Sequence, residues 1–289
     1  MVEYILGNYL VQTGKITKEQ LAQTLEKQDS VRVKLGLIAV AEGMMTLEQT
    51  AEVNRLQALM DQRFGTIAVQ KGYLTDEQVG KLLKKQGNAY LSFIQSLVDS
   101  EYLEMEDIDL VVNSFRLING YSNSEMDALK SDEAERIVPL FVPEEGKQFT
   151  NIISTAVKTL IRLIDRHIYI GNAEMTEAFP AKDMVSQSLK GDNGLVSCLS
   201  EGNGALLKVC SVYGQEEFEQ LDLDSLDAAG ELLNCMNGLY VSGLSREGHF
   251  LELMPPDYSD VTSKAKTAIC KIPIFIGDQK FYFTVAELA

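Results

Sequence analysis

The first 86 residues repeat themselves with a period of 29, and this repeat limits the fold of the N-terminal part more than any other feature. Pairs of an apolar residue and glycine recur at 6–7, 35–36 and 64–65. A fixed period of this length is typical of arrays in which each copy is one supersecondary unit that buries its apolar face against other copies. The N-terminal part is therefore expected to consist of the same small motif several times over.

Each copy is predicted to be a pair of short helices. A threonine followed three residues later by glutamine is a capping box, in which the two side chains satisfy free backbone N–H groups at a helix start. A glycine just before it can end the preceding helix in the left-handed conformation. The boxes are Thr17 to Gln20, Thr46 to Gln49 and Thr75 to Gln78, and the glycines are Gly14, Gly43 and Gly72.

A fourth, fainter copy occupies residues 92–115, with Glu101 at the position of the glycine. Terminal repeats often lose the features that their neighbours would have used, so this copy is interpreted as an acidic capping unit. Residues 1–118 are thus predicted to form an all-helical repeat domain. Residues 119–148 are predicted to be a helical connector, with prolines Pro139 and Pro143 near its end.

Three of these units, at 5–28, 34–57 and 63–86, resemble the MshEN domain in motif length and in the spacing between copies. The resemblance implies that a consecutive pair of motifs binds cyclic di-GMP. Units two and three have a cation at the opening position, whereas unit one has Ile5 there, and Thr50 and Asn54 stand where that family has leucines. The implied ligand site consists of Lys34, Leu35, Gly36, Arg63, Phe64 and Gly65. The alternative is a repeat kept only as a docking or dimerising bundle, so a homo-oligomer stays open at this point.

Residues 149–289 are predicted to form an α+β domain with long helices on an antiparallel-rich sheet. Apolar spacing indicates a long amphipathic helix from Phe149 to near Gly171. Strands are expected at 194–202 and 205–213, joined by a tight turn at Asn203-Gly204, and further strands at 249–253, 265–276 and 281–285.

The segment 227–238 of this domain reads as an amphipathic helix with two polar side chains, Glu231 and Asn234, three residues apart on one face. Such a pair alone is common and carries little information. An amide can nevertheless hold a water in line with an electrophile, and a carboxylate can pair with a partner's cation. The acidic run at 216–224 before this helix is either a solvated face or a docking edge for a basic partner.

This helix, the proline-bearing segment 251–256 and the closing segment 272–285 together resemble the CheX-like members of the CheC/CheX/FliY phosphatase family. The resemblance implies that Glu231 and Asn234 are catalytic and accelerate hydrolysis of the aspartyl phosphate of a CheY-type response regulator in chemotaxis or related two-component signalling. Asn234 would orient the water and Glu231 would pair with a receiver lysine, while Mg²⁺ would belong to the receiver. The alternative is a non-catalytic module that binds a receiver or cyclic di-GMP.

Composition narrows the remaining classes of function. The net charge of −16 arises entirely after residue 90 and would repel nucleic acid and anionic membranes. No apolar run reaches the ~18 residues of a membrane helix and no signal peptide is indicated, so a cytoplasmic protein is expected. The four cysteines lie in apolar stretches and the two histidines lack a second ligand at suitable spacing, so no metal site is expected.

Overall fold

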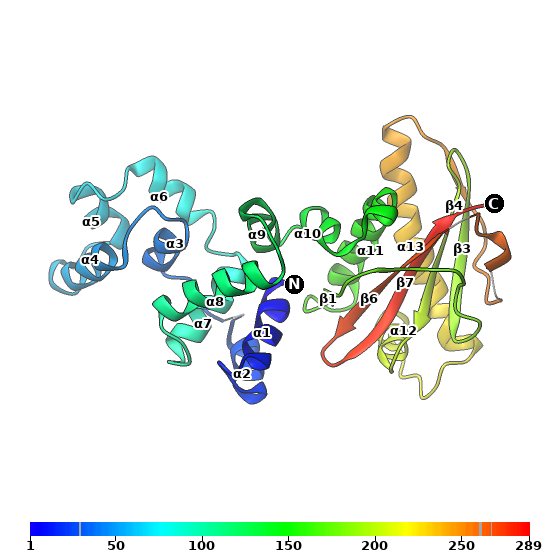
Figure 1. Cartoon of the computed structure of the whole chain (residues 1–289), viewed down its shortest axis with the longest axis horizontal. Helices are drawn as coiled ribbons and strands as arrows, with labels where there is room; N and C mark the ends of the chain where they lie inside the picture. The colour runs from blue at the N-terminus through cyan, green and yellow to red at the C-terminus, as the bar shows by residue number, and fades with distance from the viewer. Residues whose placement is uncertain (29, 260–261, 267) are drawn as a thin grey trace. The chain divides into compact units, whose positions relative to one another are not determined.

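The computed structural model describes residues 1–28, 30–259, 262–266 and 268–289. Contacts divide the chain into two compact units, residues 2–132 and residues 133–289 together with Met1 (Figure 1). Mixed helix and antiparallel sheet confirm the predicted α+β class. Within the described ranges, every helix is too short or too polar to cross a membrane.

The first unit is helical throughout its described part, as predicted from the repeat. Its helices are α1 (Val2–Gln12), α2 (Lys18–Gln28), α3 (Leu35–Ala41), α4 (Leu47–Met60), α5 (Phe64–Gln70), α6 (Asp76–Leu83), α7 (Ala89–Asp99), α8 (Met105–Ile118) and α9 (Asn123–Lys130). Each repeat copy contributes one helical hairpin, α1–α2, α3–α4, α5–α6 and α7–α8.

The capping boxes that begin the second helix of the first three hairpins are confirmed. In the third, for example, the Gln78 backbone N–H donates to Thr75 Oγ1 over 3.2 Å, and the Thr75 N–H donates to Gln78 Oε1 over 2.8 Å. The glycines before the boxes all have positive φ, between 65° and 72°. Glu101, at the same position of the fourth copy, has a φ of 56°, so the copy without glycine adopts the same turn.

The four hairpins pack in two pairs rather than as a simple linear stack. Helices α3 and α4 pack on α5 and α6, so copies two and three form one pair. Helices α1 and α2 pack on α7, and α1 also contacts α8, so copies one and four form the other. The degenerate fourth copy therefore completes the pair that begins at the N-terminus.

The second unit begins with α10 (Ala134–Phe141) and the 3₁₀ helix η1 (Glu144–Phe149) and continues with α11 (Thr150–Leu163), α12 (Ala205–Gly214), α13 (Leu223–Arg246) and the 3₁₀ helix η2 (Thr262–Lys264). Its strands are β1 (Tyr169–Ile170), β2 (Glu174–Thr176), β3 (Met184–Gly191), β4 (Leu195–Glu201), β5 (Leu251–Leu253), β6 (Ile269–Ile276) and β7 (Gln279–Glu287).

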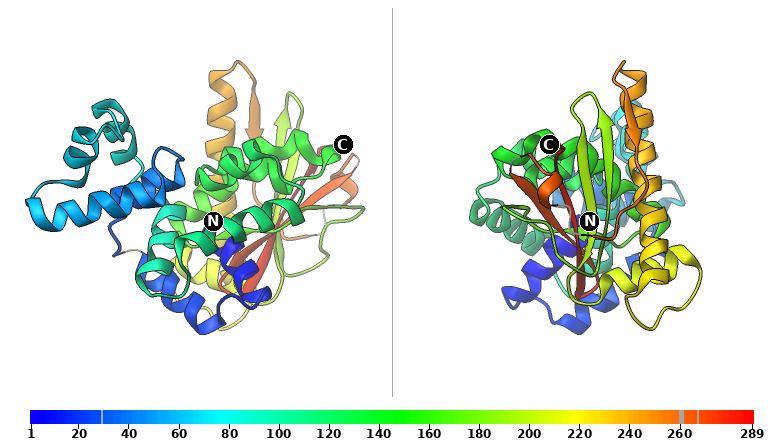
Figure 2. Two further views of the ribbon diagram at one scale, coloured as in Figure 1. Left: turned by 60° about the vertical axis from the view of Figure 1, so that its left-hand side comes forward. Right: turned by 90° about the vertical axis from the view of Figure 1, so that its right-hand side faces the viewer.

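These strands form one antiparallel sheet in the order β1-β6-β7-β4-β3-β5. Strand β2 pairs with residues 269–271 at the start of β6, whereas β1 pairs with residues 274–275 near its end. Helix α13 packs on β3 and β5 and also contacts α11 and α12. Figure 2 shows α13, coloured yellow to orange, lying along the sheet. Side chains that alternate along β6 and β7 bury one face of both strands, and the fully buried Ile272, Ile274, Phe281 and Phe283 belong to this core.

Two sequence predictions are wrong in this unit. Residues 205–213, predicted as a strand, form helix α12, because the Glu201 carboxylate accepts hydrogen bonds from the backbone N–H groups of Gly202, Gly204 and Leu206 and so caps a helix start. The Asn203-Gly204 sequence leads from β4 into this helix and does not form a hairpin turn.

The helix predicted from Phe149 to near Gly171 ends at Leu163. There the Asp165 carboxylate accepts from the His167 backbone N–H over 2.9 Å and turns the chain toward β1. The strands β1, β2 and β3 have no counterpart in the prediction. Thr267, inside the predicted strand 265–276, lies outside the described residues, and β6 begins at Ile269.

Candidate functional site

The predicted pair Glu231 and Asn234 lies on the exposed side of α13. The helix starts at a capping box in which Asp222 accepts from the Ser225 backbone N–H over 3.1 Å. Its opposite side is buried against the sheet through Leu232, Leu233 and Met236. Because the apolar side holds the helix in place, the two polar side chains project from a rigid element one turn apart.

Gln187, a buried glutamine on the sheet that was not predicted as part of the site, forms a hydrogen bond with Asn234. Gln187, on β3 and 1% exposed, donates from Nε2 to Asn234 Oδ1 and to the Met254 carbonyl, each over 2.8 Å. Its Oε1 accepts from Nδ2 of Asn237 over 2.8 Å. Nothing in the sequence marked Gln187, which stands between two serines, or Asn237, which follows Met236.

The segment after β5 forms one wall beside the pair. Pro256 and Tyr258 approach α13 at Gly230, where a Cβ would meet Tyr258 Oη at 3.2 Å and Pro256 Cβ at 3.3 Å. Tyr258 donates from Oη to Asp227 Oδ1 over 2.9 Å. Burial, this hydrogen bond to Asp227 and the charges of Asp227 and Glu231 raise the pKa of Tyr258 to about 12, so the phenol is neutral at pH 7.

The same segment is fixed to the sheet by Asp257. Its backbone exchanges two hydrogen bonds of 2.8 Å with Ser186, and its carboxylate pairs with Lys264 at 2.6 Å. The hydrogen bonds from Lys264 and Ser259 lower the pKa of Asp257 to about 2. Asp257 is therefore ionised at neutral pH and holds the wall of the site in place.

The surface around Glu231 and Asn234 is acidic and partly apolar. Asp224 and Asp227 lie on the exposed side of α13, and the acidic residues 216–222 precede the helix. Leu223 is 71% exposed and Leu239 is 49% exposed on the same helix. Exposed leucines among carboxylates suit a protein surface that carries basic and apolar groups.

The six residues predicted for ligand binding in the repeats all line one pocket of about 1240 Å³, formed mainly by copies two and three and lined also by Gln95, Val98 and Met105 of copy four. The opening motifs of copies two and three pack against each other, with the glycine of each motif facing the large side chain of the other. A Cβ at Gly36 would meet Phe64 Cε2 at 3.0 Å, and one at Gly65 would meet Leu35 Cδ2 at 3.4 Å. Each glycine thus admits the large side chain of the other copy and brings the two opening motifs together.

The pair formed by copies one and four cannot offer the same site. With the period of 29, the positions of Lys34 and Arg63 correspond to Ile5 and Ser92, and that of Gly65 corresponds to Ile94. Ile94 is buried, as are Leu6 and Phe93 beside it in their motifs. Ile5 and Ser92 are uncharged, and Ile94 has a large side chain where copy three has glycine, so only copies two and three bring cations to both openings.

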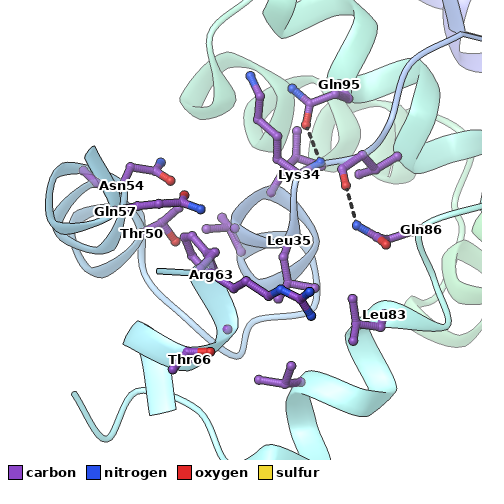
Figure 3. Close-up of a pocket in the computed structure, with 18 of the residues that line it drawn as sticks. Lys34, Leu35, Thr50, Asn54, Gln57, Arg63, Thr66, Leu83, Gln86 and Gln95 are labelled. Carbon is purple, nitrogen blue, oxygen red and sulfur yellow. Dashed lines mark hydrogen bonds between the residues drawn. The ribbon is translucent and has the colours of Figure 1, made fainter. Parts of the chain in front are cut away.

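Cations dominate the charged residues of the pocket: Arg32, Lys34 and Arg63 line it together with a single carboxylate, Asp76. Arg63 makes no ion pair with the part of the chain that is described, and its side chain extends past Leu35 toward Leu83 (Figure 3). Lys34 pairs with Asp99 at 2.7 Å and is largely exposed. An unpaired guanidinium in a pocket can bind phosphate or stack on a base.

Two glutamines hold the strand-like segment before Lys34 at the pocket edge. Gln95 Oε1 accepts from the Lys34 backbone N–H over 3.0 Å, and Gln86 Nε2 donates to the Val33 carbonyl over 2.9 Å (Figure 3). Gln86 is the last residue of the third repeat unit, and its hydrogen bond holds the segment before Lys34 in place. Gln95 was not identified from the sequence.

Histidine, cysteine and acidic side chains do not cluster as metal ligands in the part of the chain that is described. It contains no group of three or more His, Cys, Asp or Glu side chains placed to hold a metal ion. The cysteines are free, and three of them are buried. Burial raises the pKa of Cys210 to about 12 and that of Cys270 to about 11, so these thiols are protonated at neutral pH.

Comparison with known proteins gives structural similarity only. No protein-family model and no curated protein sequence matches the chain. Chemotaxis protein CheX from Desulfovibrio desulfuricans is 15% identical, with a TM-score of 0.41, over 48% of this chain and 97% of that one. A chain of the CheX-CheY-BeF3-Mg²⁺ complex from Borrelia burgdorferi is 17% identical, with a TM-score of 0.41, over 48% of this chain and 96% of that one. A CheC-like protein from Shewanella oneidensis is 13% identical, with a TM-score of 0.42, over 49% and 98%.

Proposed function

We propose that the second unit accelerates hydrolysis of the aspartyl phosphate of a CheY-type receiver at Glu231 and Asn234. The observation that carries the proposal is that the pair projects from a rigid, exposed helix face, with the Asn234 amide fixed from below by Gln187. The resemblance of the Glu-x-x-Asn helix and its flanking segments to CheX-like phosphatases supports the partner class. The acidic surface around the pair supports a partner with a lysine near its phosphorylated carboxylate.

In the proposed reaction water attacks phosphorus and the bond between phosphorus and the aspartyl oxygen breaks. The products are inorganic phosphate and a free receiver carboxylate, and no covalent intermediate forms on this chain. Asn234 holds the water in line, which lowers the entropic part of the barrier. Glu231 pairs with the receiver lysine and so contributes to binding as well as to the transition state. Mg²⁺ held by the receiver would neutralise the phosphoryl oxygens.

The test is phosphate release from a phosphorylated CheY-type receiver. Asn234→Ala is expected to lower kcat by about 100-fold or more with receiver affinity nearly unchanged, because it removes a group that acts mainly in the transition state. Glu231→Ala and Glu231→Lys should weaken both affinity and rate. Ser242→Ala, exposed two turns further along α13, is the matched control and should behave as wild type.

Two outcomes would contradict the enzyme assignment. If wild-type protein released phosphate no faster than buffer while binding the receiver, the second unit would be a binding module. If Asn234→Ala were as fast as wild type, catalysis would have to arise elsewhere.

We propose as a second function that the pocket between copies two and three binds cyclic di-GMP. The specific observation in favour is that three cations and one carboxylate gather around a large pocket in a chain whose net charge is −16. A dianion with planar bases matches a pocket that combines Arg63 with apolar walls. Binding there would let the repeat unit regulate the second unit.

Calorimetry with cyclic di-GMP tests this function. Arg63→Ala should abolish the binding heat, whereas Ile5→Ala, at the equivalent position of copy one, should leave it unchanged. Absence of heat with the intact protein at high ligand concentration would leave the repeats a structural or docking bundle.

A further inference from the structure

Three amide side chains and one hydroxyl form a continuous hydrogen-bonded relay beneath the candidate catalytic pair. It runs from Asn234 to Gln187, then to Asn237 and Ser197. Gln187, Asn237 and Ser197 are each at most 1% exposed, whereas Asn234 is exposed at the surface end. The relay links α13 to β3 and β4. One end, at Ser197, lies in the core of the second unit, and the other end, at Asn234, lies in the candidate site.

The Met254 carbonyl sets the direction of every amide in this relay. A backbone carbonyl can only accept, so the Gln187 atom 2.8 Å away must be its NH₂ group. The other proton of that group then points at Asn234, and the atom of Asn234 that receives it must be the oxygen. The Gln187 oxygen faces Asn237, which supplies the matching donor over 2.8 Å. The orientation of Asn234 thus follows from a fixed acceptor 67 residues beyond Gln187 in the sequence.

The consequence for the surface is that Asn234 turns its oxygen inward and its NH₂ group outward. Reversing the amide would place an NH₂ group against the Gln187 NH₂ group inside the protein, where an unsatisfied donor is costly. Asn234 therefore presents hydrogen-bond donors to whatever docks on α13. One of the two lone pairs of its oxygen accepts from Gln187 within the chain.

We propose that Gln187 is a positioning residue that fixes Asn234 as a hydrogen-bond donor, aimed at the oxygen of the attacking water or at a phosphoryl oxygen. The role in catalysis rests on the proposed phosphatase function, whereas the orientation of the amide does not. A donor on the water oxygen leaves a lone pair free to attack phosphorus. A donor on a phosphoryl oxygen stabilises the charge that develops there.

Kinetics of two variants test the positioning role. Gln187→Met fills a similar volume but cannot donate to Asn234, so kcat for phosphate release should fall about 10- to 100-fold, as expected when a reacting group is misplaced by about 1 Å. Affinity for a receiver loaded with beryllofluoride and Mg²⁺ should stay within about twofold, because the exposed docking face is unchanged. Asn234→Asp keeps the acceptor toward Gln187 and replaces the outward donor with an acceptor, so it should be as slow as Asn234→Ala.

Val285→Ala is the matched control, since Val285 is fully buried and its strand position pairs with that of Ser197 in the same sheet. It should lose stability but keep kcat. If Gln187→Met kept wild-type kcat, or if Val285→Ala lost as much kcat as Gln187→Met, the positioning role would be overturned. Full activity of Asn234→Asp would overturn the donor role.

Side-chain amide hydrogen exchange gives a readout that does not depend on phosphatase activity. In ¹⁵N spectra of the full chain, the NH₂ resonances are assigned by their loss in Gln187→Met, Asn234→Asp and Asn237→Asp. The Gln187 and Asn237 protons should exchange slowly with water and the Asn234 protons rapidly. Slow exchange of the Asn234 protons would mean that its NH₂ group points inward, and would overturn the proposal even if the wild-type protein is an active phosphatase. A protein that releases no phosphate but shows the expected exchange would retain the relay and lose the proposed function.

Discussion

The same substitution, glycine to alanine, is expected to have opposite effects at two helical positions of the repeat pair that forms the pocket. Gly36 is the second residue of α3, and Gly80 lies in the middle of α6. Neither has positive φ, so backbone conformation does not decide the outcome. The difference lies in what a Cβ atom would meet.

At Gly36 a Cβ would lie 2.6 Å from Thr50 Cγ2 and 3.0 Å from Phe64 Cε2. Thr50 is β-branched and sits in a helix, so its methyl group cannot move without leaving a preferred rotamer, and Phe64 is buried. Overpacking of this kind costs about 1–3 kcal/mol. Alanine gains up to about 1 kcal/mol in helix propensity. The net expectation for Gly36→Ala is a loss of about 1–2 kcal/mol.

At Gly80 a Cβ would meet nothing within 4 Å, and the residue is exposed. Gly80→Ala should therefore gain the full propensity difference, about 1 kcal/mol. The two variants should then differ by about 2–3 kcal/mol, or roughly 30- to 150-fold in the opening equilibrium of their helices.

Hydrogen exchange of the full chain, read by mass spectrometry on peptides from α3 and α6, measures this difference segment by segment. Exchange in α3 should be faster in Gly36→Ala and exchange in α6 slower in Gly80→Ala, each relative to wild type. Because Gly36 seats Phe64 beneath the pocket, Gly36→Ala should also weaken ligand binding. A Gly36→Ala protein at least as protected as wild type would refute the close approach of the two copies.

Two further predictions concern the second unit, and both are read by urea denaturation. Glu201→Gln weakens the cap of α12 by replacing a carboxylate that accepts from three backbone N–H groups, so the unit should lose about 1–2 kcal/mol. A stability equal to wild type would show that the cap is not needed. Asp257→Asn tests the pairing with Lys264: since the pKa of Asp257 is held at about 2, below the ordinary value near 3.9, its contribution is present above about pH 4 and is lost as the pH falls toward 2. The difference in midpoint between wild type and Asp257→Asn should therefore be largest at neutral pH and shrink below pH 4, and a difference that is independent of pH would contradict the pairing.

Local features of the repeat could be predicted from the sequence because they depend on residues a few positions apart. A capping box such as Thr75 with Gln78 closes within one helical turn, and a glycine such as Gly72 acts through its own φ. Because these residues recur with a period of 29, the same hairpin is predicted in each copy. Glu101, which replaces the glycine in the fourth copy, adopts the same left-handed conformation because the geometry of the hairpin requires it.

The sequence was a poorer guide where a distant or unexpected partner competes with local preference. Residues 205–213 have the apolar and β-branched content of a strand, yet the Glu201 carboxylate caps their first N–H groups and they form α12. The pairing of the repeat copies also escaped prediction. The period of 29 does not say which copies pack together, and in the structure the apolar openings of copies one and four pack in one pair and leave copies two and three to form the pocket.

For the candidate catalytic pair, the sequence predicted the features that depend on nearby residues and missed those that depend on distant ones. The spacing of Glu231 and Asn234 on an amphipathic helix was enough to predict that they share an exposed face. Which way the Asn234 amide points was not predictable, because Gln187 is 47 residues away in the chain and the Met254 carbonyl that orients it is 67 residues from Gln187. Only the tertiary structure brings β3, α13 and the end of β5 together. A side-chain hydrogen bond acts over about 3 Å in space regardless of separation in sequence, so the chemistry that Asn234 offers is decided by the packing of the sheet against the helix.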